Sequence, residues 1–182
     1  NSNNRTIPLP ERMRPKSMDE YVGQEHLLGK KSLLGSMIST GNLSSFILWG
    51  PPGVGKTTLA RIIANRTDRP FYTLSAISSG VKEVREIIQK SKGNGLFTPK
   101  TPILFIDEIH RFNKAQQDAL LGAVEDGTII LIGATTENPS FEVISPLLSR
   151  CQVFVLKELT VKDLDILLKR ALEKDEFLAT LD

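Results

Sequence analysis

The chain has 182 residues, enough for one well-buried domain and part of a second. Hydrophobic residues make up 40% and charged residues 24%, and no apolar run approaches the roughly 18 residues that a membrane span needs. The net charge of +2 is too small to indicate nucleic-acid binding by itself. The single cysteine, Cys151, excludes an internal disulfide and a cysteine-rich zinc site, which is typical of a protein in the reducing cytoplasm. Together with the lack of a long apolar run, this leads us to expect a cytoplasmic protein with no membrane partner.

In chain order, residues 1–16 are polar and punctuated by prolines, which predicts an extended arm. Residues 24–38 have helix-like apolar spacing, and Gly41 is placed to end that segment. Five short apolar runs then follow at the spacing of strands in an α/β protein: residues 46–49, 71–74, 103–106, 129–132 and 153–156. Amphipathic stretches over 81–90 and 115–124 predict helices between them. The fold class is therefore α/β, with a parallel, helix-covered sheet of about five strands.

A phosphate-binding signature, G-x-x-x-x-G-K-[ST], follows the first of these runs. Its residues are Gly50, Pro51, Pro52, Gly53, Val54, Gly55, Lys56 and Thr57, and Thr58 comes next in the predicted helix. The glycines let backbone amides point at phosphate oxygens, and the helix start adds positive charge. We expect Lys56 to reach the β and γ phosphates of ATP and Thr57 to place its hydroxyl on Mg²⁺. The alternative, a purely structural glycine turn, is disfavoured by the strand before the motif and the helix after it.

The run over residues 103–106 ends in two carboxylates, Asp107 and Glu108. We expect Asp107 to hold the hydration shell of Mg²⁺ and Glu108 to polarise the water that attacks the γ phosphate. Such pairs also occur as surface or capping groups, but their place after a phosphate loop favours catalysis. A dedicated water-activating glutamate favours hydrolysis over transfer to another acceptor.

Three polar residues at strand boundaries have two interpretations each. Thr136, taken as the end of the fourth strand, either contacts the γ phosphate or the attacking water, or merely caps the strand. Ser75, at the end of the second strand, either holds Glu108 in an inactive orientation or has no part in the site. Arg150, just before the last strand, either forms a surface ion pair or enters a neighbouring subunit's nucleotide site as an arginine finger.

Together these elements resemble the AAA+ ATPases. Residues 13–26, with Tyr21 and Val22, resemble the segment that the clamp loaders of this superfamily fold over the adenine. Residues 107–114 and 132–141 resemble the replication-associated recombination ATPases, the bacterial relatives of the Werner-helicase-interacting ATPase.

The resemblance implies a P-loop AAA+ three-layer fold. Residues 17–158 would be its nucleotide-binding domain, and residues 159–182 the beginning of a truncated helical lid. By the same resemblance, Thr136 is the sensor-1 residue, Arg150 the arginine finger and Ser75 the glutamate-switch position.

The family further implies DNA-stimulated ATP hydrolysis by a homo-oligomer at stalled forks and single-strand/double-strand junctions, with links to single-strand-binding protein. The family's sensor-2 arginine and C-terminal oligomerisation region lie beyond this chain, so we expect the chain alone to bind nucleotide weakly and hydrolyse it poorly. A clamp-loader or branch-migration motor subunit would share the same core. A non-hydrolysing nucleotide-binding scaffold would usually lack Lys56, Glu108 or Arg150, and all three are present.

Overall fold

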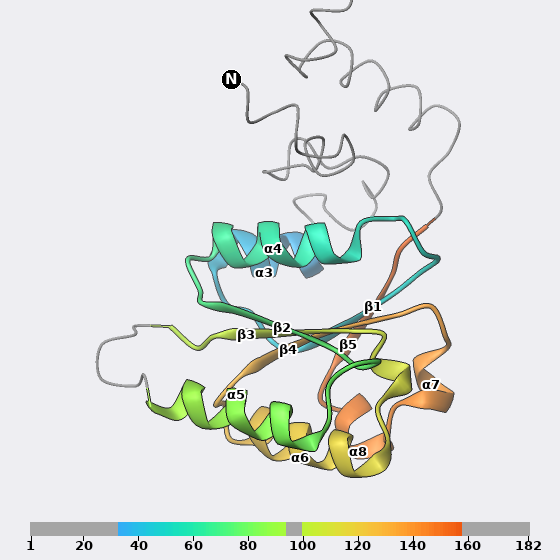
Figure 1. The fold of residues 1–182 in the computed structure, drawn as a ribbon. Helices are drawn as coiled ribbons and strands as arrows, with labels where there is room; N and C mark the ends of the chain where they lie inside the picture. Colours follow the sequence, from blue (N-terminus) through green and yellow to red (C-terminus); the bar gives the residue numbers. More distant parts are fainter. Residues whose placement is uncertain (1–32, 94–99, 158–182) are drawn as a thin grey trace, which may run out of the picture.

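The computed structural model describes residues 33–93 and 100–157, which form a parallel five-stranded sheet in the order β2-β3-β4-β1-β5 (Figure 1). The strands are β1 (Phe46–Trp49), β2 (Phe71–Ser75), β3 (Ile103–Asp107), β4 (Ile130–Thr135) and β5 (Gln152–Val155). All four neighbouring pairs are parallel. The α/β class and the five strands predicted from the sequence are confirmed.

Helices cover both faces of the sheet (Figure 1). The helices are α3 (Leu33–Thr40), α4 (Lys56–Arg66), α5 (Val81–Gly93), α6 (Lys114–Glu125), α7 (Pro139–Glu142) and α8 (Ser145–Leu148), and a 3-10 turn, η3 (Ile109–Arg111), follows β3. In Figure 1, α3 and α4 lie above the sheet, whereas α5, α6 and α8 lie below it. This arrangement makes three layers, with the sheet in the middle.

Side chains of the central strand β1 enter two hydrophobic cores, one on each face. Phe46 and Leu48 pack on the side of α4, in the same cluster as Leu59. Ile47 points the other way and joins a second cluster that contains Leu120 of α6. Burial of each such side chain stabilises the fold by roughly 1.5–3 kcal/mol. Because both faces are covered, β1 is apolar at successive positions instead of alternating with polar residues.

Parallel pairing brings the carboxyl ends of the strands to one side of the sheet, here called the carboxyl edge. At this edge Trp49, the last residue of β1, pairs with Thr135 of β4. Ser75, at the end of β2, pairs with Asp107 of β3. The segments that leave β1, β3 and β4 therefore emerge close together, where open α/β sheets bind ligands. The opposite side is called the amino edge.

Some sequence predictions fall outside the described residues: the extended arm over 1–16, the adenine-contacting Tyr21 and Val22, and the lid start over 159–182. The division into domains stays a prediction. In the part of the chain that the structure describes, no helix combines the length and the apolar character needed to cross a membrane.

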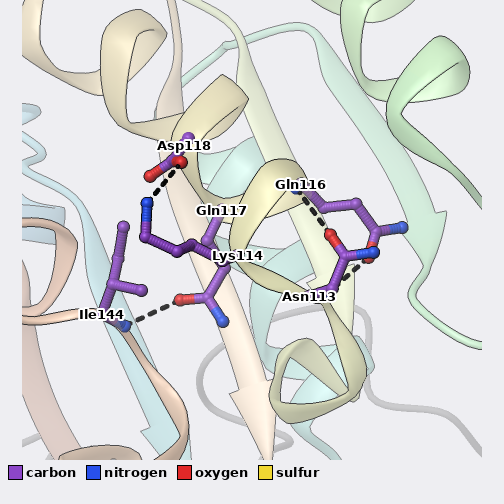
Figure 2. Close-up of polar contacts among 6 residues, drawn as sticks. All are labelled: Asn113, Lys114, Gln116, Gln117, Asp118 and Ile144. Atoms are coloured by element: carbon purple, nitrogen blue, oxygen red, sulfur yellow. Dashed lines mark hydrogen bonds and ion pairs between the residues drawn. The ribbon is translucent and has the colours of Figure 1, made fainter.

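A capping box fixes the start of α6 (Figure 2). Asn113 Oδ1 accepts a hydrogen bond from Gln116 N at 2.9 Å, and Gln116 Oε1 accepts one from Asn113 N at 2.7 Å. The Gln116 amide also donates to the carbonyl of Ser79, beyond β2, at 2.9 Å. The turn that follows β3 is thus held at its far end by both α6 and the β2–α5 connection.

A second glutamine joins the turn after β3 to the segment after β4. Gln117 is 3% exposed, and its Nε2 donates to the carbonyls of Phe112 and Glu142, each at 3.0 Å. Its Oε1 accepts from the backbone N–H of Ile144 at 2.8 Å (Figure 2). One buried side chain therefore satisfies three backbone groups on two connections at the carboxyl edge.

We expect Gln117→Ala to lower the free energy of unfolding by about 1–3 kcal/mol, because the backbone groups that its side chain now bonds would be left buried without partners. The exposed Gln89→Ala on α5 is the matched control, with an expected change within about 0.5 kcal/mol. Urea unfolding of both variants measures this, and equal stabilities would contradict the bridging role of Gln117.

The first glycine of the phosphate-binding motif lies against Leu156, the residue that follows β5. A Cβ at Gly50 would come within 2.8 Å of the Leu156 carbonyl oxygen and 2.9 Å of its Cβ. We expect Gly50→Ala to cost about 1–3 kcal/mol of stability, since backbone must move to admit the methyl group. Gly122→Ala is the control: nothing lies within 4 Å of its added Cβ, and α6 should gain about 0.5–1 kcal/mol. Thermal and urea unfolding should show a lower free energy of unfolding for Gly50→Ala and a higher one for Gly122→Ala than for the wild type.

Candidate active site

The loop between β1 and α4 has two glycines in a left-handed conformation, as expected for a phosphate-binding loop. Gly53 and Gly55 have φ of +82° and +86°, in the left-handed region that favours glycine. Val54 between them is 6% exposed and belongs to the core cluster beneath α4, so it anchors the loop. Because α4 begins at Lys56, the unpaired backbone amides of its first turn lie at the loop.

The predicted loop residues differ in exposure. Pro52 and Gly53 are exposed, whereas Pro51 and Thr57 are half-buried. Thr58, predicted among the nucleotide contacts, is 8% exposed. The structure therefore leaves Thr57 the more accessible of the two threonines at the start of α4.

The side chain of Lys56 folds back onto the loop. Its Nζ donates to the carbonyl oxygens of Gly50 at 2.7 Å and Pro51 at 2.9 Å. Burial lowers the pKa of Lys56 below its ordinary value, while the negative charges of Asp107 and Glu108 act in the opposite direction. The structure thus brings the loop lysine and the two carboxylates into one electrostatic environment at the carboxyl edge.

Glu108 holds a strained backbone conformation directly after β3. Its φ and ψ are 54° and 47°, left-handed values that cost a non-glycine residue about 1–2 kcal/mol. The next residue, Ile109, is fully buried, and a Cβ at Gly133 would lie only 3.0 Å from its Cδ1. Gly133 therefore allows η3 to pack closely on β4, and this packing helps to hold Glu108 in place. Such strain is typical of functional positions.

The carboxylate of Glu108 contacts Arg111, a residue that the sequence analysis did not select. Arg111 Nε lies 2.9 Å from Glu108 Oε2. Ser75, expected to hold Glu108 inactive, ends β2 opposite Asp107, and the structure shows no hydrogen bond from it to Glu108. The observed partner of Glu108 is Arg111, and the glutamate-switch role of Ser75 stays a prediction. The three-residue spacing of an acid and a base on a helical turn was the available signal.

The fourth strand ends at Thr135, one residue before the expected Thr136. Thr135 is 1% exposed, and its Oγ1 lies 3.0 Å from His110 Nδ1 and accepts from the N–H of Glu137 at 2.9 Å. The hydrogen bond from Glu137 to this hydroxyl stabilises the turn in which the chain leaves the sheet, and Thr136 in that turn is exposed. Residue type alone does not distinguish the two adjacent threonines, so Thr135 and His110 were missed. The sensor role of Thr136 stays a prediction.

Arg150 lies at the amino edge, away from the phosphate loop of its own chain. It lines a surface cavity of about 440 Å³ together with Ser45, just before β1, and Ile130, the first residue of β4. Its guanidinium is 3.1 Å from Glu125 Oε1 and donates to the Pro146 carbonyl at 2.9 Å. The surface ion pair is thus present. Exposed pairs contribute only about 0–1 kcal/mol, so this contact leaves Arg150 free to find another anion.

A family model for the ATPase family associated with various cellular activities (AAA) matches residues 46–159. Replication-associated recombination protein A of Haemophilus influenzae is 54% identical over 166 residues, which is 91% of this chain and 37% of that protein. The ATPase WRNIP1 of Dictyostelium discoideum is also 54% identical over 166 residues, covering 91% of this chain and 19% of that protein. This chain thus spans little more than a third of the bacterial relative.

Among solved structures, the Thermotoga maritima RuvB Holliday junction branch migration motor is similar, with a TM-score of 0.71 and 38% identity over 88% of this chain and 54% of that one. These relatives confirm the resemblance to the replication-associated recombination ATPases. The family match spans all five strands of the sheet and the loops at both edges. The chain belongs to the AAA family of ATPases.

Proposed function

We propose that the chain is the ATP-hydrolysing core of a DNA-dependent ATPase that acts at stalled replication forks and recombination intermediates in the bacterial cytoplasm. The observation that carries this proposal is the shared electrostatic environment of Lys56, Asp107 and Glu108 at one edge of the sheet. A protein that binds nucleotide without hydrolysing it needs only the phosphate-binding loop. The additional carboxylates fit a hydrolytic reaction.

Triphosphate binding falls to the loop between β1 and α4. The first-turn amides of α4 would donate to phosphate oxygens, and Lys56 would exchange its two carbonyl partners for oxygens of the β and γ phosphates. A lysine that already bonds oxygens in this position fits that exchange. Tyr21 and Val22 are proposed to contact the adenine, on the strength of the sequence resemblance.

The donor set also fits Mg²⁺, which prefers oxygen ligands and usually takes one or two side chains plus substrate phosphates. Thr57 and Asp107 would hold it, directly or through water. No group of three or more His, Cys, Asp or Glu residues gathers within residues 33–93 and 100–157, so a site formed jointly with the phosphates is the fitting arrangement. When bound, Mg²⁺ neutralises charge on the β and γ phosphates.

In the proposed reaction Glu108 orients a water molecule and accepts its proton. The water oxygen bonds to the γ phosphorus as the bond from that phosphorus to the bridging oxygen breaks, so ADP and phosphate leave. Thr136, the first residue beyond β4, is proposed to contact the γ phosphate or this water. The strained backbone of Glu108 and the buried Ile109 beneath it would hold the carboxylate at the site.

Arg150 is proposed to complete a neighbouring subunit's site. Its guanidinium cannot reach a nucleotide bound to the same chain. The four residues of β1 separate the amino edge from the carboxyl edge by about 13 Å, at 3.3 Å per residue. A homo-oligomer in which the amino edge of one subunit meets the carboxyl edge of the next would bring this guanidinium to the γ phosphate.

DNA as the activating partner is proposed from the relatives, whose names place them in replication-associated recombination. The similarity to a branch migration motor supports the alternative of a motor acting on branched DNA. Binding to single-strand-binding protein stays a prediction of the sequence resemblance.

Glu108→Gln should leave ATP bound but slow its hydrolysis about 10²- to 10⁴-fold, because the amide cannot accept the proton. Phosphate release and fluorescent-ATP binding by the whole protein measure the two effects, with the exposed Glu86→Gln as control. Gapped, forked and end-containing DNA should raise the wild-type rate above that with intact duplex. An ATPase rate that no form of DNA changes would contradict the proposed DNA dependence but not the proposed ATPase activity.

Subunit mixing tests the role of Arg150. Arg150→Ala and Lys56→Ala should each be nearly inactive, since loss of an arginine finger costs about 10³–10⁵ in rate. In a 1:1 mixture, about a quarter of randomly formed interfaces would pair an intact Lys56 with an intact Arg150. Activity should therefore return. A mixture of Lys56→Ala with Glu108→Gln should stay inactive, because both changes damage the same half of the site. No recovery in the first mixture would show that Arg150 does not act in a neighbour's site.

A further inference from the structure

Thr135, the last residue of β4, joins three segments at the carboxyl edge. Its backbone carbonyl accepts a hydrogen bond from the N–H of Gly50, the first residue of the phosphate loop, at 3.1 Å. Its hydroxyl oxygen accepts from the N–H of Glu137 at 2.9 Å and lies 3.1 Å from the Glu137 carbonyl oxygen. The same hydroxyl oxygen is 3.0 Å from Nδ1 of His110, in the turn after β3. Because Thr135 is 1% exposed, these contacts are shielded from water.

The contact between His110 and Thr135 is a hydrogen bond in either neutral form of the imidazole. A hydroxyl has one proton and two lone pairs, and the N–H of Glu137 uses one lone pair. If the hydroxyl donates its proton to the Glu137 carbonyl, Nδ1–H donates to the second lone pair. If Nδ1 carries no proton, it accepts the proton of the hydroxyl. His110 is therefore bonded to Thr135 in both forms.

This hydrogen bond connects the two turns that carry the groups proposed to act on water. Strands β3 and β4 pair directly, so the turns that follow them leave the sheet side by side. His110 comes two residues after Glu108, in the first of these turns. Thr136 comes directly after Thr135, inside the turn that the Thr135 hydroxyl stabilises.

We propose that His110 is a positioning residue that fixes the spacing between Glu108 and Thr136 through its hydrogen bond to Thr135. The inference rests on the proposed ATPase function, in which Glu108 activates water and Thr136 contacts that water or the γ phosphate. The effect of His110 passes through Thr135 and not through nucleotide binding, which falls to the loop between β1 and α4.

Apolar packing brings these turns together but does not fix their spacing. Ile109 lies so close to β4 that a Cβ at Gly133 would be 3.0 Å from its Cδ1. Contacts of this kind have no preferred direction, whereas a hydrogen bond constrains both distance and angle. Thr136 is exposed, so burial of its own side chain does not hold it. The hydrogen bond from His110 therefore supplies the directional link between the two turns.

The experiment measures kcat and KM for ATP turnover by the whole protein. His110→Leu removes Nδ1 and should lower kcat about 10- to 100-fold, as expected when reacting groups shift by about 1 Å. KM for ATP should be unchanged, because the phosphate loop is intact. His110→Asn places a polar atom at the same distance along the side chain as Nδ1 and should return kcat toward the wild-type value.

A double variant tests whether the effect passes through the turn of β4. Thr136→Ala alone should also lower kcat. In His110→Leu/Thr136→Ala the loss of kcat should be smaller than the product of the two single losses, because a missing hydroxyl cannot be misplaced. Full multiplication of the two losses would overturn the proposal, and so would a His110→Asn rate as low as that of His110→Leu.

Gln89→Leu, at an exposed position of α5, is the matched control for the change to leucine and should leave kcat unchanged. A wild-type kcat for His110→Leu would overturn the inference and leave the ATPase function intact. If His110→Leu melts at a lower temperature than the wild type, His110→Phe, which keeps an aromatic ring without Nδ1, takes its place with the same expectation. If the wild type cleaves ATP no faster than Glu108→Gln, the proposed function and this inference both fall.

Discussion

Parallel pairing of β1 with β4, and of β3 with both β2 and β4, is the constraint on which the rest of the structure depends. It forces the phosphate loop, the acidic pair and the end of β4 to leave the sheet on the same side. Each of these segments carries a different proposed function: anion binding, metal and water chemistry, and a hydroxyl contact. No single segment contains the site. The sheet assembles it from residues that are far apart in the sequence.

The cores on the two faces give this edge its rigidity. Val54 ties the phosphate loop to the cluster on the α4 side, whereas Ile109 ties the turn after β3 to the cluster on the other side. Gln117 and the Asn113 cap then connect the surrounding turns through buried or paired polar groups. Strain at Glu108 is tolerated because the fully buried Ile109 that follows it restricts the backbone.

Local sequence patterns predicted the fold and the loop well. A phosphate-binding motif combines glycine geometry, a lysine and a helix start within eight residues, and continuous apolar runs identify covered strands. What the patterns missed depends on one-residue differences in register. Thr135 and Thr136 look alike in sequence, yet only Thr135 is within the sheet and buried. The partner of Glu108 was also missed, because its identity follows from a left-handed backbone angle that places Arg111 beside the carboxylate.

The placement of Arg150 at the amino edge affects how rate should scale with the amount of protein. Under the arginine-finger role proposed for Arg150, a lone copy would hold both halves of the chemistry without combining them, so turnover per molecule would climb as copies associate. In an open row of subunits one terminal nucleotide would always lack a donated guanidinium, whereas a closed circle would leave none deficient. Dilution would then switch the enzyme off without unfolding it, and closure of the assembly would itself be a form of control.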